Sequence, residues 1–195
     1  MVDEIILVTG KEEVSYCQKE IIEKYNIKKV KAIVSGGKER YHSVFCGLQA
    51  LEKEESTAQY VMIHDGARPF IDDAIIERCA QGVEKYKACV AGTPVKDTIK
   101  IADEDLFAVQ TPNRSNVWMV QTPQTFERTM IWDAYKTIIA EEQSGKTISV
   151  TDDAMVVEKM TDYKVKMILG SYENIKITTP EDLQIAQLFC DKRQY

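Results

Sequence analysis

The 195-residue sequence lacks several features that would assign it to a class at once. It carries 25 basic residues against 31 acidic ones, a formal net charge of −6, and no basic stripe of the kind found in nucleic-acid-binding proteins. No apolar run is long enough to span a membrane. No GxGxxG motif follows a predicted strand, which argues against a dinucleotide-dependent reductase. We therefore expect neither nucleic acid nor a membrane among the partners.

Cysteine is scarce, and its positions form no recognisable pattern. The five cysteines are odd in number, and no two have the spacing of a metal site. Such usage indicates free thiols in a reducing compartment, so the sequence predicts a cytoplasmic protein. The positions are Cys17, Cys46, Cys79, Cys89 and Cys190.

Strands and helices are predicted to alternate through the first half of the chain. Short apolar runs rich in β-branched residues predict strands, and apolar residues at helical spacing predict helices. This alternation is typical of an α/β fold in which helices cover both faces of a mainly parallel, Rossmann-like sheet. The expected strands are 4–8, 30–34, 60–63 and 88–92, and the expected helices are 11–25, 43–51 and 72–86.

The alternation breaks after Pro94. Short alternating runs with charged turns predict that residues 95–121 form a β-rich arm protruding from the sheet. Its apolar side chains, among them Phe107 and Trp118, are too many to stay exposed in a monomer. We therefore expect a homodimer formed through this arm, within a single domain that covers 1–195.

Helices return after the arm. We expect helices at 127–142 and 152–160, the second with Thr151 as its N-cap. Strands are expected at 165–169 and 174–177. A final helix should begin at Pro180 with acidic residues in its first turn.

Polar side chains follow several predicted strands, where ligands bind in an open α/β sheet. Gly36-Gly37 allows a close backbone approach to a ligand, although such a pair also serves in plain turns. Asp65 follows a buried strand and suits Mg²⁺ held by one carboxylate and substrate phosphates, or else a turn paired with Arg68. Lys176, in a predicted strand, either extends its ammonium to the edge of the sheet or meets an anion, and we favour the anion. His64 is expected to be structural, and His42 a surface residue without a role.

Six short motifs stand in order along the chain. They are GGKERYHS at 36–43, HDGARPF at 64–70, PVKDTIK at 94–100, VQTPQTF at 120–126, TDDA at 151–154 and NIKITTPEDL at 174–183. With this order and spacing, from one end to the other, the chain resembles the methylerythritol phosphate cytidylyltransferase family. The resemblance implies a nucleotide-diphospho-sugar transferase-like fold.

The resemblance implies transfer of CMP from CTP to 2-C-methyl-D-erythritol 4-phosphate, a sugar-alcohol phosphate, with release of pyrophosphate. Asp65 would hold Mg²⁺, and Lys176 would bind the α-phosphate. The implied nucleotide-binding residues are Gly36, Gly37, Lys38, Arg40, Ser43, Asp65, Ala67 and Arg68. The implied substrate-binding residues are Thr98, Arg114, Thr122, Thr151 and Lys176, with Arg114 reaching in from a partner's arm.

Two departures from the family pattern qualify these expectations. Lys38 stands where many relatives have a small or acidic residue. The family also opens with a strand, a Gly-rich loop ending in Arg and a Pro-Lys-Gln motif, none of which precedes residue 4 here. We therefore expect an N-terminally incomplete nucleotidyltransferase domain. The alternatives are a ribitol-5-phosphate cytidylyltransferase and a non-catalytic fragment that dimerises.

Overall fold

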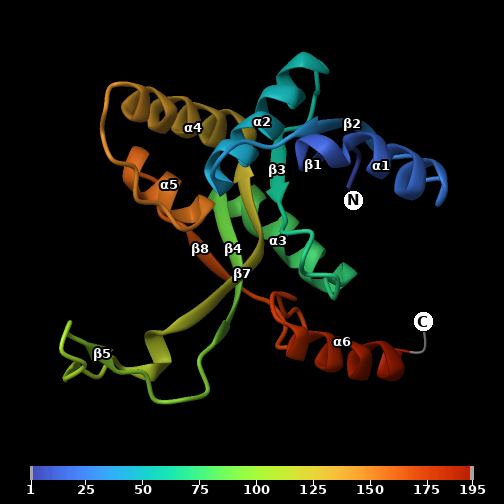
Figure 1. The fold of residues 1–195 in the computed structure, drawn as a ribbon. Helices are drawn as coiled ribbons and strands as arrows, with labels where there is room; N and C mark the ends of the chain where they lie inside the picture. Colours follow the sequence, from blue (N-terminus) through green and yellow to red (C-terminus); the bar gives the residue numbers. More distant parts are fainter. Residues whose placement is uncertain (1, 194–195) are drawn as a thin grey trace. The chain divides into compact units, whose positions relative to one another are not determined.

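The computed structural model describes residues 2–193 and divides the chain into two compact units (Figure 1). Unit 1 holds the residues up to Ile63 together with Phe126–Val165. Unit 2 holds His64–Thr125 and the residues from Lys166 on. The chain therefore passes between the units more than once, and the predicted single domain 1–195 stays a prediction.

The first part of unit 1 is a parallel strand pair with helical cover. Strand β1 (Ile5–Thr9) pairs with β2 (Val30–Ser35), with Leu7 opposite Ile33. The segment between them was predicted to be a helix, and it is one, although its type changes along the chain from 3-10 to α to π. Its pieces are η1 (Lys11–Glu13), α1 (Val14–Tyr16) and η2 (Cys17–Glu23). Helix α2 (Arg40–Lys53) packs on both strands.

The rest of unit 1 comprises β3 (Tyr60–Ile63), α4 (Arg128–Gln143) and α5 (Asp153–Met160). Helix α4 packs against α2 and α5 and buries one apolar face, with Ile131 and Ile138 fully buried. The predicted cap of α5 was wrong by one residue. Asp152, not Thr151, is the N-cap, because its carboxylate accepts the Met155 N–H at 2.8 Å.

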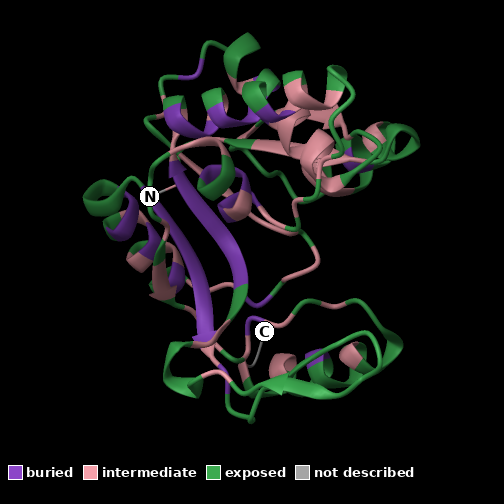
Figure 2. Ribbon diagram, turned by 90° about the vertical axis from the view of Figure 1, so that its left-hand side faces the viewer, coloured by how far each residue is buried: buried purple, intermediate pink, exposed green. Residues whose placement is uncertain are grey.

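Unit 2 is built on a sheet in which β7 (Trp118–Glu127), β4 (Ala88–Pro94) and β8 (Lys166–Leu169) are neighbours in that order. Strands β4 and β8 are parallel. Most of β4 and β7 is buried, and these buried strands are purple in Figure 2. Helix α3 (Asp73–Tyr86) packs on β4 and β8, where a Cβ on Gly82 would come within 2.9 Å of Ile168. Parallel strand pairs with packed helices confirm the predicted α/β class.

The arm extends away from the other elements of unit 2 (Figure 1). Strands β5 (Ile101–Ala102) and β6 (Ala108–Gln110) pair antiparallel, and a short 3-10 turn, η3 (Arg114–Asn116), follows them. Nearly every residue from 96 to 116 is exposed. From Trp118 on, the predicted arm segment already belongs to β7, which runs without a break into the sheet.

The predicted strand at 174–177 was wrong. This segment is extended, but it joins no sheet. Ile177 instead donates its backbone N–H to the Ala67 carbonyl, 2.8 Å away, in the loop that follows β3. Helix α6 (Pro180–Arg193) begins at the predicted proline. Among residues 2–193, no helix combines the length and the apolarity needed to cross a bilayer.

The capping of α5 gives a direct stability test. We expect Asp152→Ala to lower the free energy of unfolding by about 1 kcal/mol, because it removes the side-chain acceptor of the Met155 N–H. Thr151→Ala is the matched control and should have a clearly smaller effect. Urea unfolding of both variants measures the difference. Equal losses would mean that the neighbouring threonine also caps the helix.

Candidate active site

The loop after β3 is held by a threonine hydroxyl that bonds in two directions. The Thr122 hydroxyl accepts the Asp65 N–H at 3.0 Å and lies 3.0 Å from Nδ1 of His64. A carbonyl oxygen can only accept, so the other ring nitrogen of His64, Nε2, donates to the Arg68 carbonyl at 3.0 Å. Burial lowers the pKa of His64 below its ordinary value, which favours the neutral ring. In that form Nδ1 carries no proton and accepts from the Thr122 hydroxyl. The expectation that His64 is structural agrees with these contacts.

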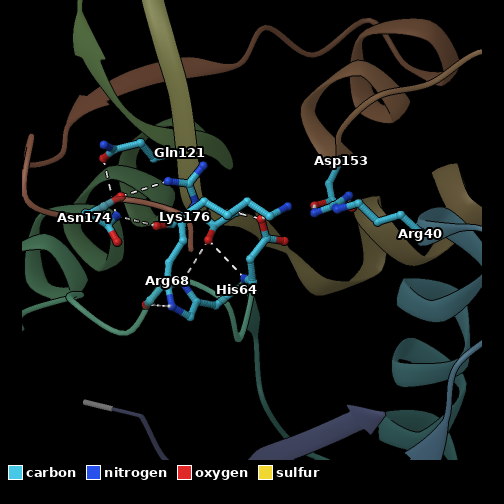
Figure 3. A network of polar contacts seen from close by, with 9 residues as sticks. Arg40, His64, Arg68, Gln121, Asp153, Asn174 and Lys176 are labelled. Atoms are coloured by element: carbon cyan, nitrogen blue, oxygen red, sulfur yellow. Dashed lines mark hydrogen bonds and ion pairs between the residues drawn. The ribbon is translucent and has the colours of Figure 1, made fainter. Parts of the chain in front are cut away.

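A buried asparagine ties the segment before α6 to the same loop. Asn174 is fully buried and donates from Nδ2 to the Thr122 carbonyl at 2.9 Å. The main-chain carbonyl of Asn174 accepts from Arg68 Nη1 at 2.8 Å. Gln121 adds a bond from Nε2 to the Ser171 carbonyl at 2.7 Å. The bonds that join Asn174 to Thr122 and to Arg68 are shown in Figure 3. Together with the bond from Gln121, they take the place of strand pairing in positioning residues 174–178.

The result of this network is a charged cluster in unit 2. Lys176 Nζ lies 3.0 Å from Asp65 Oδ2, and Arg68 Nε lies 3.8 Å from the same oxygen. The Arg68 side chain is 13% exposed and burial lowers its pKa, whereas the Lys176 side chain is 42% exposed. Lys176 can therefore turn from the carboxylate toward an anion in solvent. The structure thus brings together the predicted residues Asp65, Ala67, Arg68, Thr122 and Lys176.

The paired glycines after β2 are required by close packing. A Cβ on Gly36 would lie 2.6 Å from Ser43 Oγ, and one on Gly37 would lie 2.3 Å from the His42 Cβ. The Ser43 hydroxyl accepts the Gly37 N–H at 3.1 Å. Ser43 therefore shapes this turn from inside the helix that follows it, while Lys38 at the tip is exposed.

Arg40, the first residue of α2, is bound to a buried carboxylate. Its two terminal nitrogens lie 2.9 and 2.7 Å from the two oxygens of Asp153, which is fully buried (Figure 3). The resemblance places Arg40 near the nucleotide. The structure shows that much of its hydrogen-bonding capacity is already engaged within unit 1.

His42, expected to be a surface residue without a role, is half-buried and makes a side-chain contact. Its Nε2 lies 2.7 Å from Glu142 Oε2, and the Tyr41 hydroxyl donates to the other oxygen at 2.6 Å. These bonds lower the pKa of Glu142, and the bond to Glu142 raises the pKa of Tyr41 to about 12. The side chains border a hollow of about 530 Å³ in unit 1, which Lys38 and Lys146 also line.

Three predicted substrate contacts lie on exposed segments. Thr98 and Arg114 are on the arm, where Arg114 Nη1 donates to the Lys96 carbonyl at 2.9 Å. Thr151 is exposed just before α5. Thr122, by contrast, is 3% exposed. In the structure, Thr122 therefore positions the loop that carries Asp65. Its predicted contact with a substrate stays a prediction.

Sequence reasoning missed the residues that hold the site from behind. Asp153, Tyr135, Asn174 and Gln121 are all buried and hydrogen-bonded. Three of them stood inside quoted motifs, Asp153 in TDDA, Gln121 in VQTPQTF and Asn174 in NIKITTPEDL. The signal that could have found them was a polar residue inside a motif, next to apolar positions, which indicates a buried hydrogen-bonding side chain.

The cluster around Asp65 also bears on the predicted Mg²⁺. Among the described residues, no group of three or more His, Cys, Asp or Glu side chains could hold a metal ion. A metal at Asp65 would thus take one protein carboxylate, with ligand oxygens and water completing its shell. That arrangement fits Mg²⁺, which commonly binds through one or two carboxylates and substrate phosphates.

Solved structures with the same fold define the class. The structure is similar to a 4-diphosphocytidyl-2C-methyl-D-erythritol synthase from Anaerococcus prevotii, with a TM-score of 0.86 and 38% identity over 97% of this chain and 79% of that one. It is also similar to 2-C-methyl-D-erythritol 4-phosphate cytidylyltransferase from Francisella tularensis, with a TM-score of 0.75 and 25% identity over 95% and 80% of the two chains. The fold is therefore the nucleotidyltransferase-like α/β fold, and the protein is of the cytidylyltransferase class.

Sequence comparison identifies the family within that class. The family model described as IspD, 2-C-methyl-D-erythritol 4-phosphate cytidylyltransferase, matches residues 1–192. Relatives of that name are 46% identical in Caldanaerobacter subterraneus and 49% identical in Alkaliphilus oremlandii. The matches cover 98% and 99% of this chain and 80% and 78% of those relatives. The chain belongs to the 2-C-methyl-D-erythritol 4-phosphate cytidylyltransferase family.

The buried amide of Asn174 generates a prediction for this site. Asn174→Ala removes the donor to the Thr122 carbonyl and leaves that buried group unpaired, which costs about 1–3 kcal/mol of unfolding free energy. The segment that carries Lys176 should also loosen, seen as faster amide hydrogen exchange at Ile177. Gln187→Ala, on the exposed face of α6, is the control. Unchanged exchange at Ile177 would contradict the positioning part of Asn174.

Proposed function

We propose that this protein transfers CMP from CTP to 2-C-methyl-D-erythritol 4-phosphate, forming 4-diphosphocytidyl-2-C-methyl-D-erythritol and pyrophosphate. Family membership supports the reaction. The observation that assigns the reaction to particular residues is the cluster of Lys176, Arg68 and Asp65. In this cluster two cationic side chains lie beside one carboxylate, and all three residues are on loops rather than in a core. Such a cluster suits a ligand that brings several phosphate charges and a cation.

The reaction requires the protein to position the two substrates and to neutralise phosphate charge, and it requires no general base. A phosphate oxygen of the sugar-alcohol phosphate attacks the α-phosphorus of CTP in line. A new P–O bond forms, the bond to the β-phosphate oxygen breaks, and that oxygen leaves with pyrophosphate. The attacking phosphate is already ionised, so no side chain needs to accept a proton. Lys176 neutralises the charge that develops on the α-phosphate oxygens. Arg68 is held in position by its hydrogen bond to the main-chain carbonyl of Asn174.

Mg²⁺ is proposed as the cofactor, held by Asp65. When bound, it supplies charge neutralisation and orientation of the phosphates. The backbone N–H of Asp65 is anchored to Thr122, so its carboxylate is presented from a rigid base. Asp65 and Lys176 attract one another at 3.0 Å, which keeps both side chains at the same place before substrates arrive.

The nucleotide and the sugar-alcohol phosphate are assigned to different residues. Gly36, Gly37, Lys38, Arg40 and Ser43 are proposed to contact the nucleotide from unit 1, as the family resemblance implies. Ala67 and Arg68, beside Asp65 in unit 2, are proposed to contact it as well. The sugar-alcohol phosphate is assigned to Thr98, Arg114, Thr122, Thr151 and Lys176.

The proposed reaction is tested by pyrophosphate release from this chain. Lys176→Gln should lower kcat on the order of a hundredfold, because a charge that stabilises the transition state is lost. Lys85→Gln, on exposed α3 surface, is the matched control and should leave the rate unchanged.

The same assay separates the alternatives. Turnover of ribitol 5-phosphate but not of methylerythritol phosphate would assign the other cytidylyltransferase. Absence of turnover with either substrate would support a non-catalytic fragment. Normal kcat in Lys176→Gln would remove this lysine from the chemistry.

We further propose a homodimer formed through the arm. Leu106 is 86% exposed and Phe107 is 72% exposed, and Val109 beside them is 61% exposed. Leu106 also has a φ of +67°, a left-handed conformation that L-residues rarely adopt. A strained, apolar tip in solvent is costly for a monomer, so its burial against a second copy explains why it is kept.

Sedimentation tests the arm. Phe107→Asp should shift the protein from dimer to monomer, since a charge is placed in the proposed contact. Tyr16→Asp replaces an aromatic residue of unit 1 that is 61% exposed, and it should leave the dimer intact. A dimer that persists in Phe107→Asp at micromolar concentration would refute the arm contact.

The proposed compartment is the cytoplasm. All five cysteines are free in the structure, and three of them, Cys17, Cys79 and Cys89, are buried. Free buried thiols support a reducing environment.

A further inference from the structure

A second buried ionic group lies outside the Asp65 cluster, at the junction of three helices of unit 1. The Asp153 carboxylate is fully buried. It receives two hydrogen bonds from Arg40, at 2.9 and 2.7 Å, and one from the Tyr135 hydroxyl, at 2.5 Å. Tyr135 is itself fully buried, and this burial, with the nearby carboxylate, raises its pKa. Arg40 begins α2, Asp153 begins α5, and Tyr135 lies within α4.

On one side, this group anchors the nucleotide loop, which we define as residues 36–39. The loop starts where Gly36 donates its N–H to the Thr9 carbonyl at 2.8 Å, and it ends at Arg40. Inside it, the Gly37 N–H is bound to Ser43. With both ends held and only a few residues between them, the position of the Arg40 side chain helps to determine where the loop backbone lies.

On the other side, the same carboxylate sets the start of α5. Asp152 caps this helix, and Thr151, a proposed contact of the sugar-alcohol phosphate, comes just before it. Asp153 lies in the first turn and is held by α2 and α4 together. One buried carboxylate therefore connects the proposed nucleotide loop with a proposed substrate residue.

Electrostatics argues that stability alone does not explain this pair. A cation at the first position of α2 lies at the positive end of the helix dipole, where an anion would be favoured. A fully buried carboxylate is also costly to desolvate, and well-packed apolar residues often stabilise a fold as well or better. What the pair offers instead is geometry, because a guanidinium bound at two points to a carboxylate has a defined position and orientation.

We propose that Asp153 is a positioning residue for the reaction, acting through Arg40 on the nucleotide loop and through the start of α5 on Thr151. Tyr135 shares this task by holding one oxygen of the carboxylate. Asp153 touches neither substrate. The inference rests on the proposed function only in taking CTP as the nucleotide.

The test measures CTP binding by titration calorimetry in the presence of Mg²⁺, with thermal unfolding recorded for every variant. Asp153→Asn keeps the shape of the side chain but removes its charge. We expect its Kd for CTP to rise about tenfold, because small displacements of binding groups have effects of this size or larger. Tyr135→Phe removes a single bond, so its Kd should rise less, about twofold.

A matched control separates loop positioning from general loss of stability. Asp72→Ala removes the N-cap carboxylate of α3 in unit 2, which accepts the Ile75 N–H at 2.8 Å. It should lower the unfolding temperature and leave the Kd for CTP unchanged. If Asp153→Asn fails to fold, Tyr135→Phe carries the comparison, since it removes one bond to the carboxylate and leaves Arg40, itself a proposed nucleotide contact, unchanged.

Steady-state kinetics gives a quantity, the KM for each substrate, that would not change if Asp153 only stabilised the fold. Loss of positioning raises KM for both substrates, whereas partial unfolding lowers the apparent kcat and leaves KM unchanged. An unchanged Kd and KM in folded Asp153→Asn, or in Tyr135→Phe if Asp153→Asn does not fold, overturns the proposal, as does a wild-type chain that does not bind CTP. A wild-type chain that binds CTP without turnover refutes the proposed function alone, because the Kd comparison still decides the part of Asp153.

Discussion

The Thr122 hydroxyl is the contact on which the cluster in unit 2 depends. It accepts from the Asp65 backbone and donates to His64, which in turn donates to the Arg68 carbonyl. The loop that carries the charged residues is thereby closed on itself without using any of their side chains. Asn174 then joins the segment before α6 to this loop, so that Lys176 arrives beside Asp65. Hydrogen bonds between neutral groups, together with the one from Arg68 to the Asn174 carbonyl, hold these segments in place, and Lys176 and Asp65 remain to meet a ligand.

Unit 1 follows a different principle, because its loop is held by a buried ion pair. Arg40 and Asp153 form it, and Tyr135 completes the hydrogen bonding of the carboxylate. A buried charge without such partners would be severely destabilising, so each of these residues depends on the other two. The glycines of the adjacent loop could not carry side chains, since Ser43 and His42 fill the space that a Cβ would need.

Local sequence pattern predicted elements well where packing and pattern agree. Strand β3 and the buried strand β4 follow from their apolar runs, and α3 from its helical spacing. The pattern failed at 174–177, because alternation describes an extended segment and does not say what it pairs with. It also failed at the start of α5. Thr151 and Asp152 are both good caps, and only the position of the helix in the fold chooses between them.

The sequence by itself determined the α/β class, the exposed apolar arm and the charged residues of the site, since these depend on composition, periodicity and order along the chain. The tertiary structure decided which groups support them. The bonds from Arg40 to Asp153 span 113 positions, and the bond from Arg68 to Asn174 spans 106. Partners so far apart leave no periodic signal, because their distance in space is set by how whole helices and strands pack. The chemistry of the site could therefore be predicted from motifs, whereas its rigidity required the folded chain.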